Sequence, residues 1–297
     1  MRNRVLMTIM ALWTVAAGMT AQEFLRVFST KSNPEPVVKN TVRYNNATKS
    51  KERIYINTDY CSYMVIRKGA RYYNALPGEN LVESRPVQSQ ASEGNYAATN
   101  YHYWRGVFPK KDAGAGYYAL PSAAGEKVVV DPHTIHFKGS EREESYMSFG
   151  VQENDTVYAM RGGVACLSGD KKGVVISHTD ETFAVYYHMR RALVQPGENV
   201  ETGQPVGLAA GKEVHVGFVY LDEKYFKQKE MAEEYPYTHF LPQIWDGSQF
   251  VRYDKPAVVV APALTDEVVT QDMTKAQKKR YMKNKSKTII NNNINQF

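Results

Sequence analysis

The sequence predicts an all-β protein with an N-terminal β-sandwich-like module, an antiparallel β-sheet domain, one short helix and a basic C-terminal tail. Short segments rich in β-branched and aromatic residues recur along the chain, and clusters of Gly, Pro and Asn separate them, which is typical of strands and turns. Between about residues 145 and 222 no apolar pattern has the period of a helix. The 297 residues are enough for two domains.

The N-terminus has the pattern of a secretory signal peptide, which we assign to residues 1–21. Two arginines precede an apolar run from Val5 to Ala17, and small residues follow up to Ala21. Because the run is short for a bilayer span, cleavage between Ala21 and Gln22 is favoured over a retained anchor. No cysteine stands at the cleavage point to accept a lipid. We therefore expect a periplasmic or secreted protein with no transmembrane span after cleavage.

Residues 22–138 are predicted to form the N-terminal β-module. Its clearest strand segments are 53–57, 63–67 and 100–104. Aromatic residues are dense here, and on a strand such residues more often pack in a core than bind a ligand. An exposed apolar patch on residues 50–105 would instead indicate an adhesion or interaction surface.

Residues 139–262 are predicted to form the second domain, an antiparallel sheet with a hairpin extension at its C-terminal end. Its strand segments are 157–159, 173–177, 183–187 and 214–219. A polar segment that favours helix follows at 223–234, and Asp246-Gly247 marks the turn of the later hairpin.

Residues 263–297 form a basic tail that we expect to be disordered or helical. The formal net charge of +6 is concentrated in the signal peptide and this tail, so the folded body is close to neutral. The sequence therefore does not indicate a nucleic-acid-binding face on the domains.

The chain has two cysteines, Cys61 and Cys166, so no disulfide framework is present. They lie far apart in the sequence and in different predicted domains. Two isolated, buried thiols in β-structure are therefore favoured over a single bridge between them.

Four sequence blocks of the second domain occur in a distinctive order. They are Asp155–Val164, Gly173–His178, Tyr186–Met189 and Val194–Gly207. In order and spacing they resemble the LytM/lysostaphin-type zinc metallopeptidase domain, also called the duplicated hybrid motif, as found in secreted Bacteroidetes-type proteins. The resemblance covers about residues 144–221 and implies a LytM-like antiparallel β-sheet domain.

The resemblance also implies a metal site, of which this chain keeps only part. In the family, zinc is bound by the His and Asp of an early motif and by the second His of a late His-x-His motif. The late ligand matches His215, and a His that acts on the attacking water or oxyanion matches His188. The early ligands fall on Glu144 and Ser148, and the first late His falls on Glu213. Serine is a poor zinc ligand, so the resemblance implies a degenerate site.

A rewired metal site is the alternative. In it Glu144, or another acidic residue of 141–144, binds metal beside His215, while Glu213 serves as general base and His188 as its catalytic partner. Zinc is the cofactor in that case, and otherwise we expect none.

Two further histidines are candidates for other roles. His136 lies in a predicted loop and is a possible additional ligand, although a loop histidine without neighbouring cysteines is more often simply exposed. His178 follows a predicted strand, and a role in the fold is the expected one.

The leading functional interpretation is a non-catalytic, peptidase-like envelope protein that binds peptidoglycan or regulates a cell-wall hydrolase. The resemblance implies a groove whose floor contains His188, His215 and Glu213, and a groove filled by the protein's own side chains would count against ligand binding there. One alternative is an active zinc endopeptidase that cleaves peptidoglycan peptide bridges. The other is a secreted adhesion or interaction protein that uses the N-terminal β-module.

Overall fold

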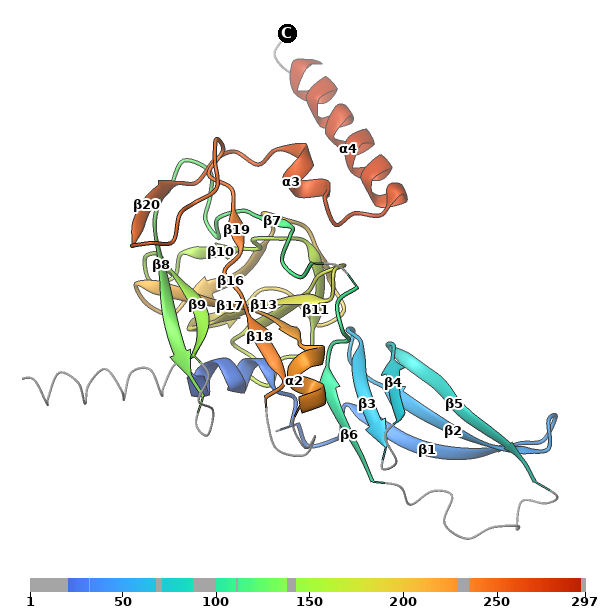
Figure 1. Ribbon diagram of the computed structural model, residues 1–297. Coiled ribbons are helices and arrows are strands. Elements are labelled where there is room, and N and C mark those ends of the chain that lie inside the picture. Colours follow the sequence, from blue (N-terminus) through green and yellow to red (C-terminus); the bar gives the residue numbers. More distant parts are fainter. Residues whose placement is uncertain are drawn as a thin grey trace, which may run out of the picture.

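The computed structural model describes most of the chain and shows a molecule built mainly of strands (Figure 1). The described residues are 21–31, 33–67, 71–87, 100–110, 112–137, 143–228 and 235–294. The all-β prediction is confirmed. The predicted signal peptide lies outside the described residues except for Ala21. Within those ranges, no helix combines the length and the apolar character that a membrane span requires.

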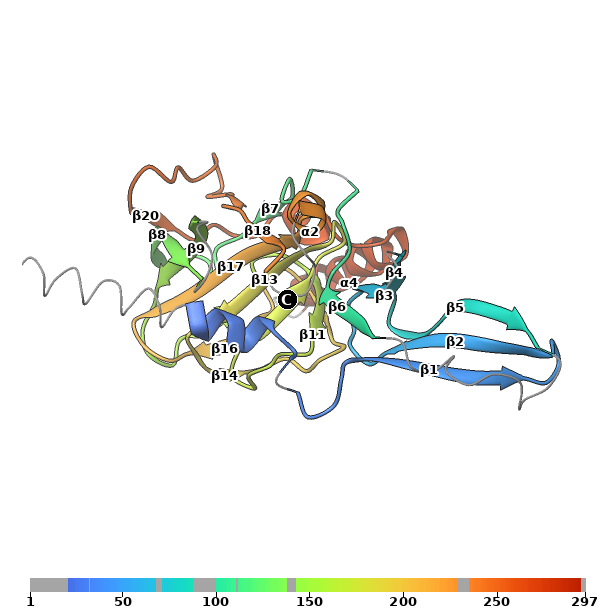
Figure 2. The same cartoon turned by 60° about the horizontal axis from the view of Figure 1, so that its bottom comes forward.

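Two antiparallel sheets of three strands make up the N-terminal part of the molecule. One has the order β1 (Val38–Asn45), β2 (Ser50–Asn57), β5 (Gly78–Pro86). The other has the order β4 (Arg71–Ala75), β3 (Tyr63–Arg67), β6 (Tyr101–Arg105). The first sheet projects from the body as a long ribbon, which we call the arm (Figure 2).

A nine-stranded sheet forms the centre of the second domain. Its order is β15 (Asn199–Val200), β11 (Gly163–Cys166), β12 (Val174–Ser177), β13 (Thr182–Tyr187), β17 (Glu213–Leu221), β9 (Glu143–Gly150), β8 (Lys127–His136), β20 (Ala257–Val260), and β18 (Tyr237–His239) also pairs with β17. Strand β8 precedes the domain boundary expected near residue 138, yet it pairs with β9 from Val130 to His136. The central sheet therefore begins earlier in the chain than the sequence blocks do.

Both faces of the central sheet are buried over much of their area. One face packs on a small sheet of order β10 (Thr156–Tyr158), β16 (Pro205–Ala209), β14 (Met189–Ala192). A parallel pair, β7 (Tyr117–Tyr118) and β19 (Gln243–Ile244), adds to this core. Because strand residues alternate between faces, Val216 and Phe218 belong to this core while Val219 and Leu221 belong to the other.

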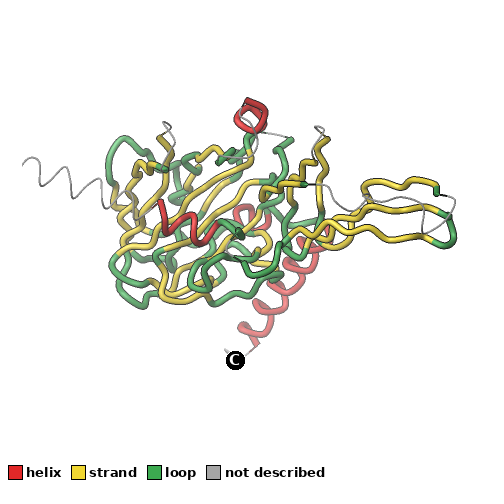
Figure 3. Tube along the Cα trace, turned by 90° about the horizontal axis from the view of Figure 1, so that it is seen from below, coloured by secondary structure: helices red, strands yellow, loops and turns green. Residues whose placement is uncertain are grey.

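The other face of the sheet is covered by a helical segment, residues 21–28, which we call the N-terminal helix. It lies across the strands, as Figures 2 and 3 both show. Phe24, Val27 and Phe28 are at the spacing of one helix face and all are buried. A Cβ atom on Gly217 of β17 would lie 2.5 Å from Phe24 Cε2, so glycine is required there for the ring to reach the sheet.

A buried polar cluster joins the N-terminal module to the central sheet. Arg105 Nη2 lies 3.4 Å from Asp59 Oδ2 and donates to Leu167 O at 2.6 Å, while Leu167 N donates to Asp59 Oδ1 at 2.7 Å. Cys61 and Cys166 are buried thiols, as expected. They are not isolated from each other, because their Sγ atoms and an Asp59 oxygen all lie within 4.8 Å of one another. The two predicted domains pack together at this point.

Three helices complete the described structure: α2 (Glu223–Gln228), α3 (Asp266–Thr270) and α4 (Lys275–Ile294). The last two occupy the basic tail, for which helix was one of the two expectations. The tail is anchored by Asp272, whose carboxylate accepts two hydrogen bonds from the buried guanidinium of Arg161, at 2.7 and 2.8 Å.

Candidate functional site

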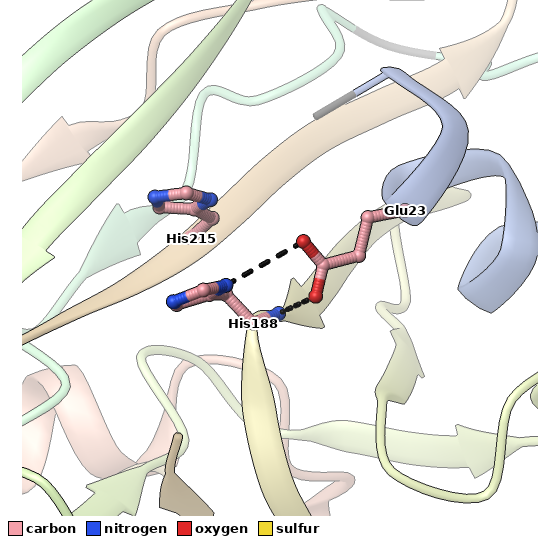
Figure 4. A group of neighbouring side chains, drawn as sticks. All are labelled: Glu23, His188 and His215. Carbon is pink, nitrogen blue, oxygen red and sulfur yellow. Dashed lines mark hydrogen bonds and ion pairs between the residues drawn. The ribbon is translucent and has the colours of Figure 1, made fainter. Parts of the chain in front are cut away.

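Three of the four predicted site residues, His188, His215 and Glu213, meet at one end of the sheet. His215 lies in β17, where its Cα is paired with Tyr187 of β13 on one side and Ser148 of β9 on the other. His188 directly follows β13. The two imidazole rings are stacked, with centroids 5.0 Å apart and an interplanar angle of 21° (Figure 4).

The backbone of His188 explains how its ring reaches His215. In a regular strand, the side chain after Tyr187 would point to the opposite face from Tyr187 and its partner His215. His188 instead has φ of 58°, in the left-handed region. A non-glycine residue there costs about 1–2 kcal/mol. This local strain places the second histidine beside the first.

Glu23 of the N-terminal helix is the third member of the group. Its Oε1 accepts a hydrogen bond from the backbone N–H of His188 at 3.0 Å, and its Oε2 lies 3.5 Å from His188 Nδ1 (Figure 4). The hydrogen bond with His188 lowers the pKa of Glu23, and the same contact raises the pKa of His188. The matched motifs do not include Glu23, because it lies 165 residues before His188 and outside the family blocks.

The surroundings of His215 disfavour its protonated form. Burial, and then the neighbouring His188, lower its pKa. Its Nε2 lies 3.4 Å from Glu213 Oε2. Because a carboxylate only accepts, this contact favours the tautomer with the proton on Nε2 and the lone pair on Nδ1. Nδ1 is buried and has no hydrogen-bond partner among the described residues. A lone pair in that position is available to a metal ion.

The two early positions of the family motif are engaged elsewhere. Ser148 Oγ lies 2.9 Å from His133 Nε2, and the latter is 3.3 Å from Asp131 Oδ2. Glu144 Oε2 accepts a hydrogen bond from the backbone N–H of His239 at 3.0 Å. The group of potential metal donors that contains His215 is completed by Glu23 and His188 instead. The family's zinc therefore does not fit the matched positions, and Glu144 as a ligand stays a prediction.

The remaining candidates lie apart from this group. His136 is exposed at the end of β8, paired in register with Glu143. His178 is buried, with Nδ1 2.8 Å from Gly162 O. Of the acidic run 141–144, residues 141 and 142 lie outside the described part of the chain.

Comparison with known proteins supports the resemblance of the second domain. Residues 144–224 match peptidase family M23, whose members are typically zinc-dependent and act on peptidoglycan. No curated protein matches the chain.

Similar solved structures include the M23 metalloprotease pseudoalterin, described as from the deep sea. It is 15% identical, with 51% of this chain and 99% of that chain covered and a TM-score of 0.34. Helicobacter pylori Csd3 in its orthorhombic crystal is 12% identical, with 88% and 87% covered and a TM-score of 0.29. The hexagonal crystal of the same protein has the same identity and TM-score, with 67% and 74% covered.

The sequence match includes His188, His215 and Glu213 together with the substituted Ser148 and Glu144. Its limits also enclose strands β10 to β17, which form most of the central sheet and all of the small sheet. The segment from residue 144 to residue 224 is therefore an M23 (LytM-type) peptidase domain.

Proposed function

We propose that this chain is an exported envelope protein whose M23 domain does not cleave peptide bonds and acts by binding a protein partner, a cell-wall hydrolase. The observation that supports this most directly is that the face of the sheet around His215 is already occupied. Ser148, which stands where the family has its zinc-binding aspartate, is hydrogen-bonded to His133. The face of the sheet around His215 is covered by the protein's own N-terminal helix. A peptide substrate would have to displace that helix before reaching His215.

The cover on the sheet is well packed. Phe24 is fully buried and meets Tyr187 edge-on at a centroid distance of 5.8 Å. Burying a phenylalanine side chain stabilises a fold by about 1.5–3 kcal/mol. A groove filled in this way disfavours binding of peptidoglycan to the floor formed by His188, His215 and Glu213, because Glu23 already contacts that floor.

The arm offers the surface for a protein partner. Among the described strands, the outer strands β1 and β5 pair only with β2, and β5 is exposed along most of its length. Leu76, two residues before β5, and Leu81, within β5, are 57% and 58% exposed. Open strand edges with nearby apolar side chains favour pairing with a strand of another protein.

The partner is tested with the mature chain, dye-labelled peptidoglycan and cell-wall hydrolases of the same envelope. We expect the chain to change the rate of dye release by a hydrolase and not to co-sediment with peptidoglycan alone. Leu76→Asp combined with Leu81→Asp should abolish the effect. Val258→Asp is the matched control, because Val258 is 70% exposed and lies on β20 of the central sheet, outside the arm.

Three results would overturn the proposal. Dye release by the chain alone would show an active endopeptidase. Co-sedimentation with peptidoglycan without any effect on a hydrolase would make the polymer the partner. An effect on the hydrolase that survives the double leucine substitution would move the contact away from the arm.

A further inference from the structure

We propose that Glu23, His188 and His215 form a divalent metal site of the zinc class that fastens the N-terminal helix onto the central sheet. This site is separate from the family's, since only His215 occupies a matched ligand position. It is structural in character, because the metal would join two segments of the chain that are 165 residues apart. The inference does not depend on the identity of the partner proposed above.

The donor atoms already lie close together. One atom from each of the three residues is within 4.8 Å of the other two, and Glu23 Oε2 is 3.5 Å from His188 Nδ1. Around tetrahedral zinc, with bonds of about 2.0–2.1 Å, neighbouring donors are about 3.4 Å apart. Only small side-chain rotations would therefore bring the three donors to bonding distance, and water would fill the fourth position.

The chemistry of the set suits zinc. Two imidazoles and one carboxylate are a common zinc ligand set, and these donors do not favour calcium or magnesium, which prefer oxygen ligands. The aromatic rings of Tyr146 and Tyr187 lie 5.2 and 5.3 Å from the ring of His215. These rings limit the access of water to one side of the site.

Two of the three ligands, Glu23 and His215, are held by a second contact. Glu23 uses Oε1 to accept from the backbone of His188, and its Oε2 faces His188 Nδ1, where the metal ion would replace the shared proton. Glu213 accepts from Nε2 of His215, which leaves the buried Nδ1 without a partner in the described structure. A carboxylate that fixes the tautomer of a ligating histidine is a common outer contact of metal sites. Glu213 is therefore a positioning residue.

The backbone strain at His188 is a further observation that favours a ligand. Its left-handed conformation costs free energy, and strained residues gather at binding sites, where another interaction offsets the cost. Stacking of the two histidine rings by itself offsets little of this conformational cost. Coordination of one metal ion by both rings would offset the cost of the left-handed conformation at His188.

The experiment is a titration of the metal-free mature chain with Zn²⁺ by calorimetry and with Co²⁺ by visible absorption. We expect one ion per chain and the intense absorption bands of tetrahedral cobalt. Glu23→Gln should weaken binding by more than about 100-fold, whereas Glu213→Gln should weaken it by about 10–100-fold, as outer contacts do. Glu23→Gln keeps an oxygen for the His188 N–H, so folding is preserved.

His133→Gln is the matched control, since His133 lies in the neighbouring cluster with Asp131 and Ser148. It should leave binding unchanged. A second readout is cleavage by trypsin after Arg26, which is exposed in the N-terminal helix and should become slower when Zn²⁺ is added. Absence of binding, or binding that Glu23→Gln leaves intact, would overturn the site and leave a simple ion pair between Glu23 and His188. Neither result bears on peptidoglycan cleavage, so the two proposals fail independently.

Discussion

The carboxylate of Glu23 accepts a hydrogen bond from the backbone N–H of His188 at 3.0 Å and also faces its imidazole. This contact joins the N-terminal helix to the end of strand β13. One face of the central sheet is thus covered by the protein's own helix.

Replacing Phe24 tests how firmly the helix is held. Phe24→Ala should lower the free energy of unfolding by about 3–5 kcal/mol, because a fully buried aromatic ring is lost and a cavity remains. Denaturant unfolding followed by fluorescence measures the change. Arg26→Ala, at an exposed position of the same helix, should change it by less than about 0.5 kcal/mol. Equal effects of the two substitutions would show that the helix does not pack on the sheet.

Gly217 provides the matching test from the side of the sheet. Gly217→Ala places a methyl group 2.5 Å from the ring of Phe24 and should cost about 1–3 kcal/mol of unfolding free energy. In a Phe24→Ala background the cost should largely disappear, because the ring that causes the clash is absent. The four unfolding free energies form a double-mutant cycle, and additive values would contradict the contact.

His178 predicts how stability depends on pH. Burial, followed by the charge of Arg161, lowers its pKa from 6.5 to about 4, while Asp180 and Asp272 act in the opposite direction. The unfolded chain therefore binds more protons than the folded one between these two values. Stability should fall as the pH decreases from 6.5 to 4, by about 3 kcal/mol from this residue.

The His178→Gln variant checks that assignment. It retains a side chain able to donate to Gly162 O but has no proton to gain in this range. Its unfolding free energy should lose about 3 kcal/mol less than the wild type between pH 7 and pH 4. Parallel pH curves for the two proteins would show that another group is responsible.

The anchor of the tail can be tested at Asp272. Its carboxylate receives two hydrogen bonds from Arg161, which is buried and also contacts Asp180 at 2.8 Å. Asp272→Ala should cost about 3 kcal/mol, at the lower end for a broken buried pair because Asp180 remains. The exposed Asp254→Ala is the control for differential scanning calorimetry. A loss no larger than that of the control would mean that the tail is not anchored here.

Export can be tested at the N-terminus. We predict that the protein recovered from outside the cytoplasm begins at Gln22, so that Glu23 is its second residue. Peptide mass spectrometry of that protein identifies the first residue. Processing beyond Glu23 would remove the contact with His188, and an unprocessed chain in the cytoplasm would contradict export.

Much of the β-fold could be predicted because its causes are local. Strand segments such as 173–177 and 214–219 are short, rich in β-branched residues and separated by turns, and both correspond to strands of the central sheet. The pairing of β8 with β9 was not predictable in the same way. It depends on contacts beyond the region of family resemblance, and β8 was expected to belong to the first module.

The candidate site was only partly predictable for a related reason. His188 and His215 belong to motifs with fixed spacing, and the structure brings their rings together. Glu23 has no such motif, and the one local signal is the apolar spacing of Phe24, Val27 and Phe28, which marks a helix with one buried face. Which surface that helix covers is decided by tertiary packing. The proximity of the two cysteines was missed for the same reason.

The most direct test of the central claim is dye release from labelled peptidoglycan by the mature chain alone, saturated with Zn²⁺, beside His215→Ala. The proposal that this M23 domain does not cleave peptide bonds predicts the same background rate for both proteins. Release by the wild type that is lost in His215→Ala would show a working hydrolase and contradict it.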